Sequence, residues 1–170
     1  LRLSELLTAA YVCKDRNVHH AELNPEWLEN GDNSGLICLS GAHYGEVGVN
    51  LLNGNEDAAR AAALKYAAWF PDAFYLELQR LPERPEWEAC VSGSVKLAEE
   101  LGLPVVATHP TQIMSRDDFN AHEARVCIAD VWVLTDKKRP RDFTPSQFFI
   151  PPETMLERFA DLPEALENTV

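Results

Sequence analysis

The sequence has little positive charge and no long apolar run, and both shortages exclude whole classes of protein. Fifteen lysines and arginines stand against 27 aspartates and glutamates, which gives a formal net charge of -12. This charge repels phosphate backbones and anionic lipids, so we expect no direct contact with nucleic acid. No stretch approaches the ~20 apolar residues that cross a membrane, and the opening LRLSELL is amphipathic rather than a signal peptide. We therefore expect a cytoplasmic protein with no membrane partner.

Motifs for metal binding and nucleophilic catalysis are also missing. Cys13, Cys38, Cys90 and Cys127 form no C-x-x-C pair, so we expect reduced core thiols rather than disulfides or zinc ligands. No serine lies in a G-x-S-x-G turn. The glycines of residues 40–48 (SGAHYGEVG) fit neither the dinucleotide nor the P-loop spacing. We expect a tight strand-to-helix turn there, and a phosphate cradle is the alternative.

What the sequence does contain is enough apolar residues for one ordinary core. Of its 170 residues, 46% are hydrophobic and 25% are charged, with no repeat and no linker rich in glycine or serine. The chain opens without methionine inside a helical pattern and closes in another. We therefore expect one domain, or part of one, excised from a longer chain.

Hydrophobic periodicity predicts helices and strands in alternation. Short apolar runs predict three strands, at residues 35–39, 73–79 and 105–108. Helical spacing and capping residues predict the helices, which are expected at residues 3–11, 24–28, up to 52, 55–70, 85–101, 115–131, and from about 151 and 163, with an irregular segment at 134–149. This order predicts an α/β fold with a parallel sheet and flanking helices.

The end of the third strand is where α/β proteins usually place their chemistry, but the residues there are inert. Pro110 and Gln112 are poor groups for holding a metal or moving a proton. His109 with His122 and Glu123 is a candidate metal set. Its spacing is loose, and adjacent helical residues point about 100° apart, so we expect solvent contacts or a salt bridge for that pair instead.

Two charged segments allow a functional and a structural interpretation. Asp117 and Asp118 have the chemistry of a general acid and base, but first-turn carboxylates are common because of the helix dipole, and we expect Ser115 to cap that helix. Residues 137–141 (KKRPR) concentrate positive charge in an acidic chain. We expect a solvated loop there, with an acidic protein surface as the alternative partner.

Five ordered blocks resemble one known family. They are residues 36–48 (LICLSGAHYGEVG), 70–78 (FPDAFYLEL), 102–108 (GLPVVAT), 118–126 (DFNAHEARV) and 159–170 (FADLPEALENTV). Together they closely resemble the amino-terminal PHP domain, the polymerase and histidinol phosphatase module, of the bacterial DNA polymerase III alpha-subunit family. The resemblance implies that residues 1–170 are the later part of a distorted βα barrel of PHP type, with the opening strands missing.

The resemblance also implies where metal ligands stand in the family. The missing strands carry an H-x-H motif, a cysteine follows the Ser-Gly after the first strand here, and an N-D-x-H segment follows the third. This sequence has Ala42, Pro110 and Gln112 at the corresponding positions, and His109 replaces the asparagine. Alanine and proline side chains have no donor atoms, and glutamine is a weak ligand for transition metals. We therefore expect no catalytic, cofactor-binding or metal-binding residue in this chain.

For function, the resemblance implies a non-catalytic scaffold. Such a domain supports the polymerase core and docks the proofreading exonuclease subunit, while DNA synthesis uses magnesium in a separate domain of the parent. The alternative is an active metal-dependent phosphoesterase or nuclease. Because excised strands leave an unpaired sheet edge, we also expect self-association through that edge.

Overall fold

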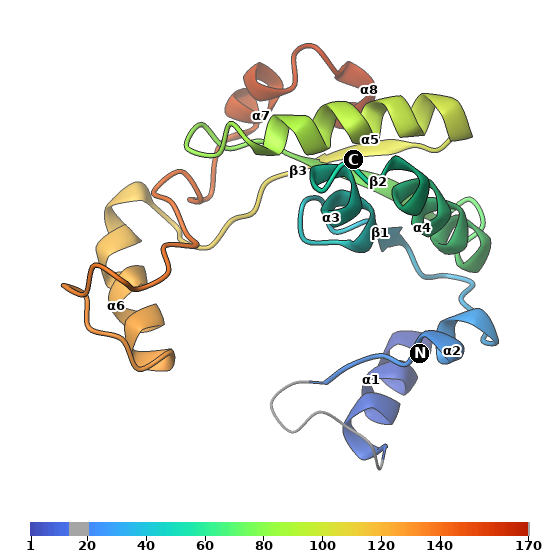
Figure 1. Cartoon of the computed structure of the whole chain (residues 1–170), viewed down its shortest axis with the longest axis horizontal. Coiled ribbons are helices and arrows are strands. Elements are labelled where there is room, and N and C mark those ends of the chain that lie inside the picture. Colours follow the sequence, from blue (N-terminus) through green and yellow to red (C-terminus); the bar gives the residue numbers. More distant parts are fainter. Residues whose placement is uncertain (14–20, 170) are drawn as a thin grey trace.

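The computed structural model describes residues 1–13 and 21–169, which form helices around a small parallel sheet (Figure 1). The strands are β1 (Cys38–Leu39), β2 (Phe74–Gln79) and β3 (Val105–Thr108). The helices are α1 (Arg2–Val12), α2 (Pro25–Glu29), α3 (Glu46–Leu52), α4 (Glu56–Trp69), α5 (Trp87–Leu101), the single 3-10 turn η1 (Arg116–Asp118), α6 (Phe119–Ala129), α7 (Pro152–Arg158) and α8 (Pro163–Glu167).

The three strands are parallel and lie in the order β1-β2-β3. Leu76 pairs with Val105 and Leu78 with Ala107, so these four side chains share one face of the sheet. Helices α3 and α4 connect β1 to β2, and α5 connects β2 to β3. The predicted α/β class with parallel strands and flanking helices is therefore confirmed.

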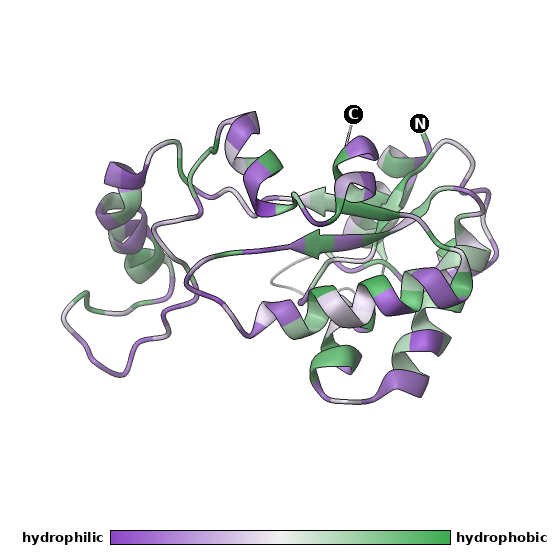
Figure 2. Ribbon diagram, turned by 90° about the horizontal axis from the view of Figure 1, so that it is seen from above, coloured by the Kyte–Doolittle hydropathy of each residue, from purple (hydrophilic) through white to green (hydrophobic). Residues whose placement is uncertain are grey.

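Strand β2 alternates between a buried and a half-buried face, and this alternation positions the core. Phe74, Leu76 and Leu78 are buried, whereas Tyr75, Glu77 and Gln79 are only partly covered. The buried face packs against α5, and α8 packs against β3 (Figure 1). Figure 2 shows the corresponding mixture along the helices, where hydrophobic residues alternate with hydrophilic ones. Apolar side chains of α4, α5 and α8 complete one core.

Local signals explain where several helices begin and end. The Asn24 side chain accepts the N–H of Glu26, and Pro25 stands at the first helical position of α2. Gly102 ends α5 in the left-handed conformation, with φ of 65°. Ser115 and Asp118 form the predicted cap as a reciprocal capping box.

The observed elements are shorter than predicted in two places. The strand expected over 35–39 is reduced to Cys38–Leu39, and Leu39 is exposed because no strand of the described chain covers the outer edge of β1. The helix expected over 115–131 begins as η1 and continues as α6 only from Phe119 to Ala129. Val131 lies beyond it at φ of 58°, which a β-branched residue adopts rarely and which stops the helix.

The two outer edges of the sheet differ. On β3, the Asn168 amide donates to the carbonyl of Val105 at 2.8 Å, and the Thr169 hydroxyl donates to the carbonyl of Ala107 at 3.0 Å. These side chains cover the β3 edge. The edge of β1 has no such cover among the described residues, and Ile37 beside it is 74% exposed. Self-association through an unpaired strand edge stays a prediction. Because the β3 edge is covered, this prediction now concerns only the outer edge of β1.

Helix α6 and the irregular segment after it stand apart from the sheet, at one end of the molecule (Figures 1 and 2). The only element that α6 contacts extensively is η1, among the described residues. Ile113 forms a single parallel bridge to Phe148, and this bridge joins the end segment to the region after β3.

Replacing Leu76 by alanine tests the position of the core. Leu76 is fully buried, so the variant loses its packing and leaves a cavity, and we expect a destabilisation of about 2–5 kcal/mol in urea unfolding. Leu64→Ala on α4 is the control, since Leu64 is 51% exposed and its truncation should have a much smaller effect. Equal losses for the two variants would contradict this core.

Candidate functional site

The candidate site lies at the carboxyl ends of the three parallel strands, not at the lateral edges formed by β1 and β3. Residues 40–43 follow β1, residues 80–81 follow β2 and residues 109–112 follow β3. In parallel sheets the carboxyl ends of the strands meet at one edge, and ligands of α/β proteins gather there. Ala42 stands three residues after β1, and Pro110 and Gln112 stand two and four residues after β3, so each lies beyond the carboxyl end of its strand.

The turn after β1 is tight and leaves no room for larger residues. Gly41 has φ of 78° and Ala42 has φ of 45°, so both lie in the left-handed region. A Cβ on Gly45 would come within 1.7 Å of the Ser40 carbonyl oxygen. This geometry confirms the predicted strand-to-helix turn. Ala42 is buried and contributes only a methyl group to the site.

The segment after β3 is held by Gln147 from the irregular region. The Gln147 amide donates to the carbonyl of Pro110 at 3.1 Å, and the N–H of Gln112 donates to the carbonyl of Gln147 at 2.8 Å. Gln147 is buried, and its side-chain oxygen also accepts the N–H of Thr144. The main chain at Pro110 and Gln112 is thus fixed by hydrogen bonds, while the Gln112 side chain is exposed.

His109 has both ring nitrogens engaged within the protein. Nε2 lies 2.9 Å from the Phe148 carbonyl oxygen, and Nδ1 lies 3.1 Å from Nη1 of Arg158. A carbonyl only accepts and a guanidinium only donates, so the ring is neutral with its proton on Nε2. Burial lowers the pKa of His109, and the positive charge of Arg158 lowers it further. The ring has no nitrogen left for a metal.

A second polar group lies on the half-covered face of β2 and β3. The Thr108 hydroxyl donates to Oε1 of Glu77 at 2.5 Å, and the Gln79 amide bridges the two. The Ser40 hydroxyl accepts the main-chain N–H of Glu77 at 2.9 Å. Sequence reasoning did not select these residues, although the alternation along β2 already places Glu77 on the face of the sheet opposite to that of Leu76. One carboxylate beside neutral groups is not a metal site by itself.

Arg80, directly after β2, is saturated by two carboxylates. Its guanidinium forms paired hydrogen bonds with Glu88 and with Asp161, and it also donates to the carbonyl of Arg158. The hydrogen bond to Asp161 is the main cause of the raised pKa of Arg80. Arg80 therefore joins the ends of β2, α5 and α7, and its contacts are structural.

His43, next to Ala42, was also missed by sequence reasoning. Its ring stacks on Trp87 with centroids 3.5 Å apart, and it is only 8% exposed. Both ring nitrogens are buried without a hydrogen-bond partner in the structure. Burial lowers the pKa of His43, with the charge of Arg84 as a further cause. We have no physical account of this unpartnered ring, and no sequence signal marked it.

The structure does not bring His109 together with His122 and Glu123. No three metal-ligating side chains converge anywhere in residues 1–13 and 21–169. His122 and Glu123 are buried on α6, where His122 Nδ1 accepts from Arg125 and Glu123 forms an ion pair with Arg139. The expected salt bridge is therefore present for Glu123.

That ion pair corrects the interpretation of residues 137–141 as a solvated loop. The side chains of Arg139 and Glu123 are only 5% and 6% exposed. Burial requires a charge to be paired, so Arg139 is turned inward to the carboxylate of α6. Its neighbours Lys137, Lys138 and Arg141 remain exposed, as predicted. Of the four cysteines, Cys90 and Cys127 are buried, and all four are free thiols, although Cys13 and Cys38 are only partly covered.

Comparison with known proteins agrees with the fold and with the blocks of similar sequence. The PHP domain family model matches residues 1–81. The DNA polymerase III alpha subunit of Neisseria meningitidis serogroup A strain Z2491 is 96% identical over all 170 residues, which are 15% of that protein. The Escherichia coli K12 and Pseudomonas fluorescens alpha subunits are 48% and 42% identical, over 81% and 99% of this chain and 12% and 14% of their own lengths.

These matches place the first half of the chain in the class of PHP domains. The whole chain is similar to bacterial DNA polymerase III alpha subunits, and it spans about one seventh of their length. The resemblance seen in the sequence is confirmed. No helix in the described part of the chain is long and apolar enough to span a membrane.

The buried ion pair of α6 predicts an asymmetric response to mutation. Arg139→Met leaves the Glu123 carboxylate buried and unpaired, and we expect a loss of about 3–5 kcal/mol in urea unfolding. Arg60→Met breaks an exposed pair with Glu100 and should cost no more than about 1 kcal/mol. The double variant Arg139→Met/Glu123→Leu should recover much of the loss. Similar costs for the two single variants would refute the burial of this pair.

The neutral state of His109 predicts acid sensitivity near neutral pH. A histidine whose pKa is lowered by folding stabilises the protein fully above its unfolded pKa of about 6.5, and this contribution decreases as pH falls from 6.5 to the folded value. His43 and His122 shift in the same direction.

We therefore expect the free energy of unfolding to fall below pH 6.5, and to fall less steeply in His109→Gln. NMR titration of the His109 ring should give a pKa below 6.5. A His109 ring that titrates at or above 6.5 would be inconsistent with this arrangement.

Proposed function

We propose that residues 1–170 are part of the PHP domain of a bacterial replicative DNA polymerase alpha subunit and serve as a non-catalytic scaffold in the cytoplasm. In this proposal the domain supports the polymerase core and docks the proofreading exonuclease subunit. The parent protein synthesises DNA with magnesium held in a separate domain. The similarity to proteins named DNA polymerase III subunit alpha supports this assignment.

One observation carries the non-catalytic role: the strand ends are closed by contacts within the protein. Both nitrogens of His109 are engaged, and Gln147 fixes the main chain at Pro110 and Gln112. The positions that the resemblance assigns to the family's metal ligands are occupied by the methyl group of Ala42, the ring of Pro110 and the exposed amide of Gln112. None of these groups binds a transition metal well or transfers a proton.

The charge of the chain supports a role away from DNA. A formal charge of -12 repels a phosphate backbone, so this segment gains nothing from direct contact with primer or template. The structural contacts at the strand ends suit a platform that keeps its shape while other domains move. Arg80 joins three elements there through Glu88, Asp161 and the Arg158 carbonyl.

The full-length alpha subunit tests this proposal through its partners and its metal content. We expect it to co-elute with the purified exonuclease subunit in gel filtration. Elemental analysis of the magnesium-free complex should find less than stoichiometric zinc or manganese. Failure to co-elute would refute docking, and stoichiometric metal together with phosphoester hydrolysis that is lost on chelation would favour the enzyme alternative.

A further inference from the structure

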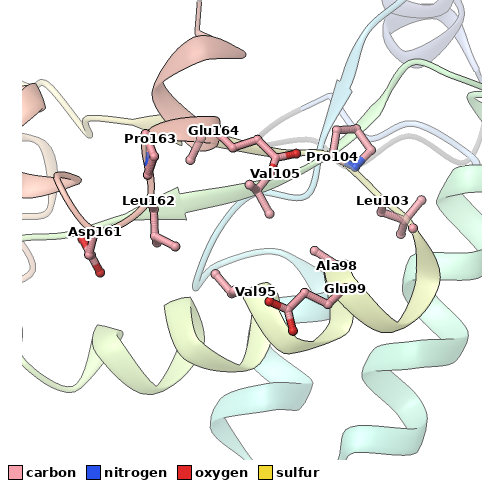
Figure 3. Close-up of a pocket in the computed structure, with 12 residues that line it drawn as sticks. Val95, Ala98, Glu99, Leu103, Pro104, Val105, Asp161, Leu162, Pro163 and Glu164 are labelled. Carbon is pink, nitrogen blue, oxygen red and sulfur yellow. The ribbon is translucent and has the colours of Figure 1, made fainter.

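An open groove lies away from the strand ends, between α5, the start of β3 and the segment that enters α8 (Figure 3). Its volume is about 620 Å³. Val95 and Ala98 of α5 face Leu162 across the groove, and the exposed side chains of Glu99 and Glu164 also line it. Because the structure shows nothing that covers this groove, we assign it no occupant.

Two Asn-Gly steps also lie away from the strand ends, one at Asn30 and Gly31 and the other at Asn53 and Gly54. Such a step is prone to lose ammonia, because glycine has no side chain to keep its main-chain nitrogen away from the asparagine amide. Asn30 directly follows α2 and Asn53 directly follows α3, and both are exposed. Their ψ angles are 3° and 1°, so both steps start from nearly the same main-chain conformation. A difference in reactivity therefore comes from their surroundings.

The surroundings of Asn53 are open. Residues 52–58 are all exposed, and a Cβ built on Gly54 would meet no atom within 4 Å. The Asn53 side chain forms no hydrogen bond with any residue that the structure describes. The N–H of Gly54 donates to the carbonyl of Leu51 at 3.0 Å, in the last turn of α3. Exposed terminal turns of this kind open at little cost in free energy, and opening frees the Gly54 nitrogen.

The surroundings of Asn30 are closed. Its amide donates to the carbonyl of Glu26 at 3.1 Å, which holds the side-chain carbon that would be attacked. A Cβ on Gly31 would collide with the Arg2 guanidinium and with the Trp27 carbonyl, and Arg2 donates to that carbonyl at 2.7 Å. Gly31 therefore cannot move toward the amide without displacing these groups.

The loop that follows Gly31 is anchored as well. The buried Asn33 amide donates to the carbonyl of Leu28 at 2.7 Å and to the carbonyl of Trp69 at 3.0 Å. These bonds join the turn at Asn30 to the end of α4. Opening this turn disturbs contacts between distant segments, whereas opening the turn at Asn53 breaks local hydrogen bonds of α3.

We propose that Asn53 is a site of spontaneous deamidation and that the fold protects Asn30 from the same reaction. The Gly54 nitrogen attacks the side-chain carbon of Asn53 and forms a cyclic imide. The amide nitrogen of Asn53 leaves as ammonia and takes the proton of the Gly54 nitrogen. Water then opens the imide at one of its two carbonyls, and the product is aspartate or isoaspartate. Water is the only co-reactant.

The products alter the connection between α3 and α4. Both add a carboxylate at the C-terminal end of α3, where the helix dipole disfavours negative charge. Glu56 and Asp57 in the first turn of α4 are close to it in sequence. Isoaspartate also carries the main chain through the former side-chain carbon, which lengthens the connection by one methylene. Deamidation therefore changes both the charge and the length of this turn.

Ageing of the full-length alpha subunit tests the proposal. The folded protein is kept in mildly alkaline buffer and digested, and mass spectrometry follows the gain of about 1 Da in the peptides that contain Asn53 and Asn30. We expect conversion to be roughly tenfold faster at Asn53 than at Asn30, since the turn at Asn53 opens more readily. Isoaspartate-specific methylation should label the Asn53 peptide. The control variant Asn53→Gln keeps an amide but disfavours the imide, so it should lose this label.

The unfolded protein separates the effect of the fold from that of the local sequence. In guanidinium chloride the two steps should convert at similar rates, because neither keeps its surroundings. Conversion of Asn30 as fast as Asn53 in the folded protein would overturn the protection assigned to the turn after α2. If Asn53 stays intact for as long as the unfolded chain needs to convert, the proposal fails. These results do not depend on exonuclease docking or metal content, so they are independent of the proposed function.

Discussion

The pairing of β2 with β3 is the constraint on which the rest of this structure depends. Its register places Leu76 beside Val105 and Leu78 beside Ala107, and this face is covered by α5 and α8. A shift by one residue would exchange the buried side chains of β2 with Glu77 and Gln79. The core, the strand ends and the groove beside α8 therefore all depend on one register.

Contacts with a later segment of the chain also hold the strand ends in place. The segment after β3 continues into a region that returns at Gln147 and Phe148, and contacts between the two segments fix the main chain around Pro110. His109 would be a natural ligand in a sheet that ended freely. Instead its nitrogens are divided between the Phe148 carbonyl and Arg158. These contacts stabilise the strand ends and occupy both ring nitrogens of His109.

Charge is distributed unevenly over the acidic chain, and the pairing of each carboxylate indicates its role. Glu123 is buried and paired with Arg139, so it holds the segment after α6 in place. Asp161 is bound by Arg80 and helps to join α5 and α7 to the end of β2. Glu99 and Glu164 project into solvent beside apolar residues. Carboxylates of the first kind stabilise the fold, whereas Glu99 and Glu164 form no ion pair within residues 1–13 and 21–169.

The sequence alone was sufficient to predict the order of helices and strands, and to identify residues whose side chains have no donor atoms. Asn24 with Pro25, Gly102, and the Ser115–Asp118 box mark helix ends because capping acts within a few residues. The strand at 105–108 and the absence of side-chain donor atoms at Ala42 and Pro110 are likewise properties of the residues themselves.

Tertiary structure alone decided three features. These are the burial of Arg139, the engagement of both ring nitrogens of His109, and the shortening of β1 to Cys38–Leu39. Each of these depends on contacts between segments far apart in the sequence, or on the lack of a neighbouring strand. Arg139 lies in a basic run that is typical of a surface loop, but Glu123 is 16 residues away and faces it only after folding. Periodicity and composition indicate whether a residue favours a helix, a strand or an exposed position. The partner of a buried charge or ring nitrogen depends instead on how distant segments of the chain meet after folding.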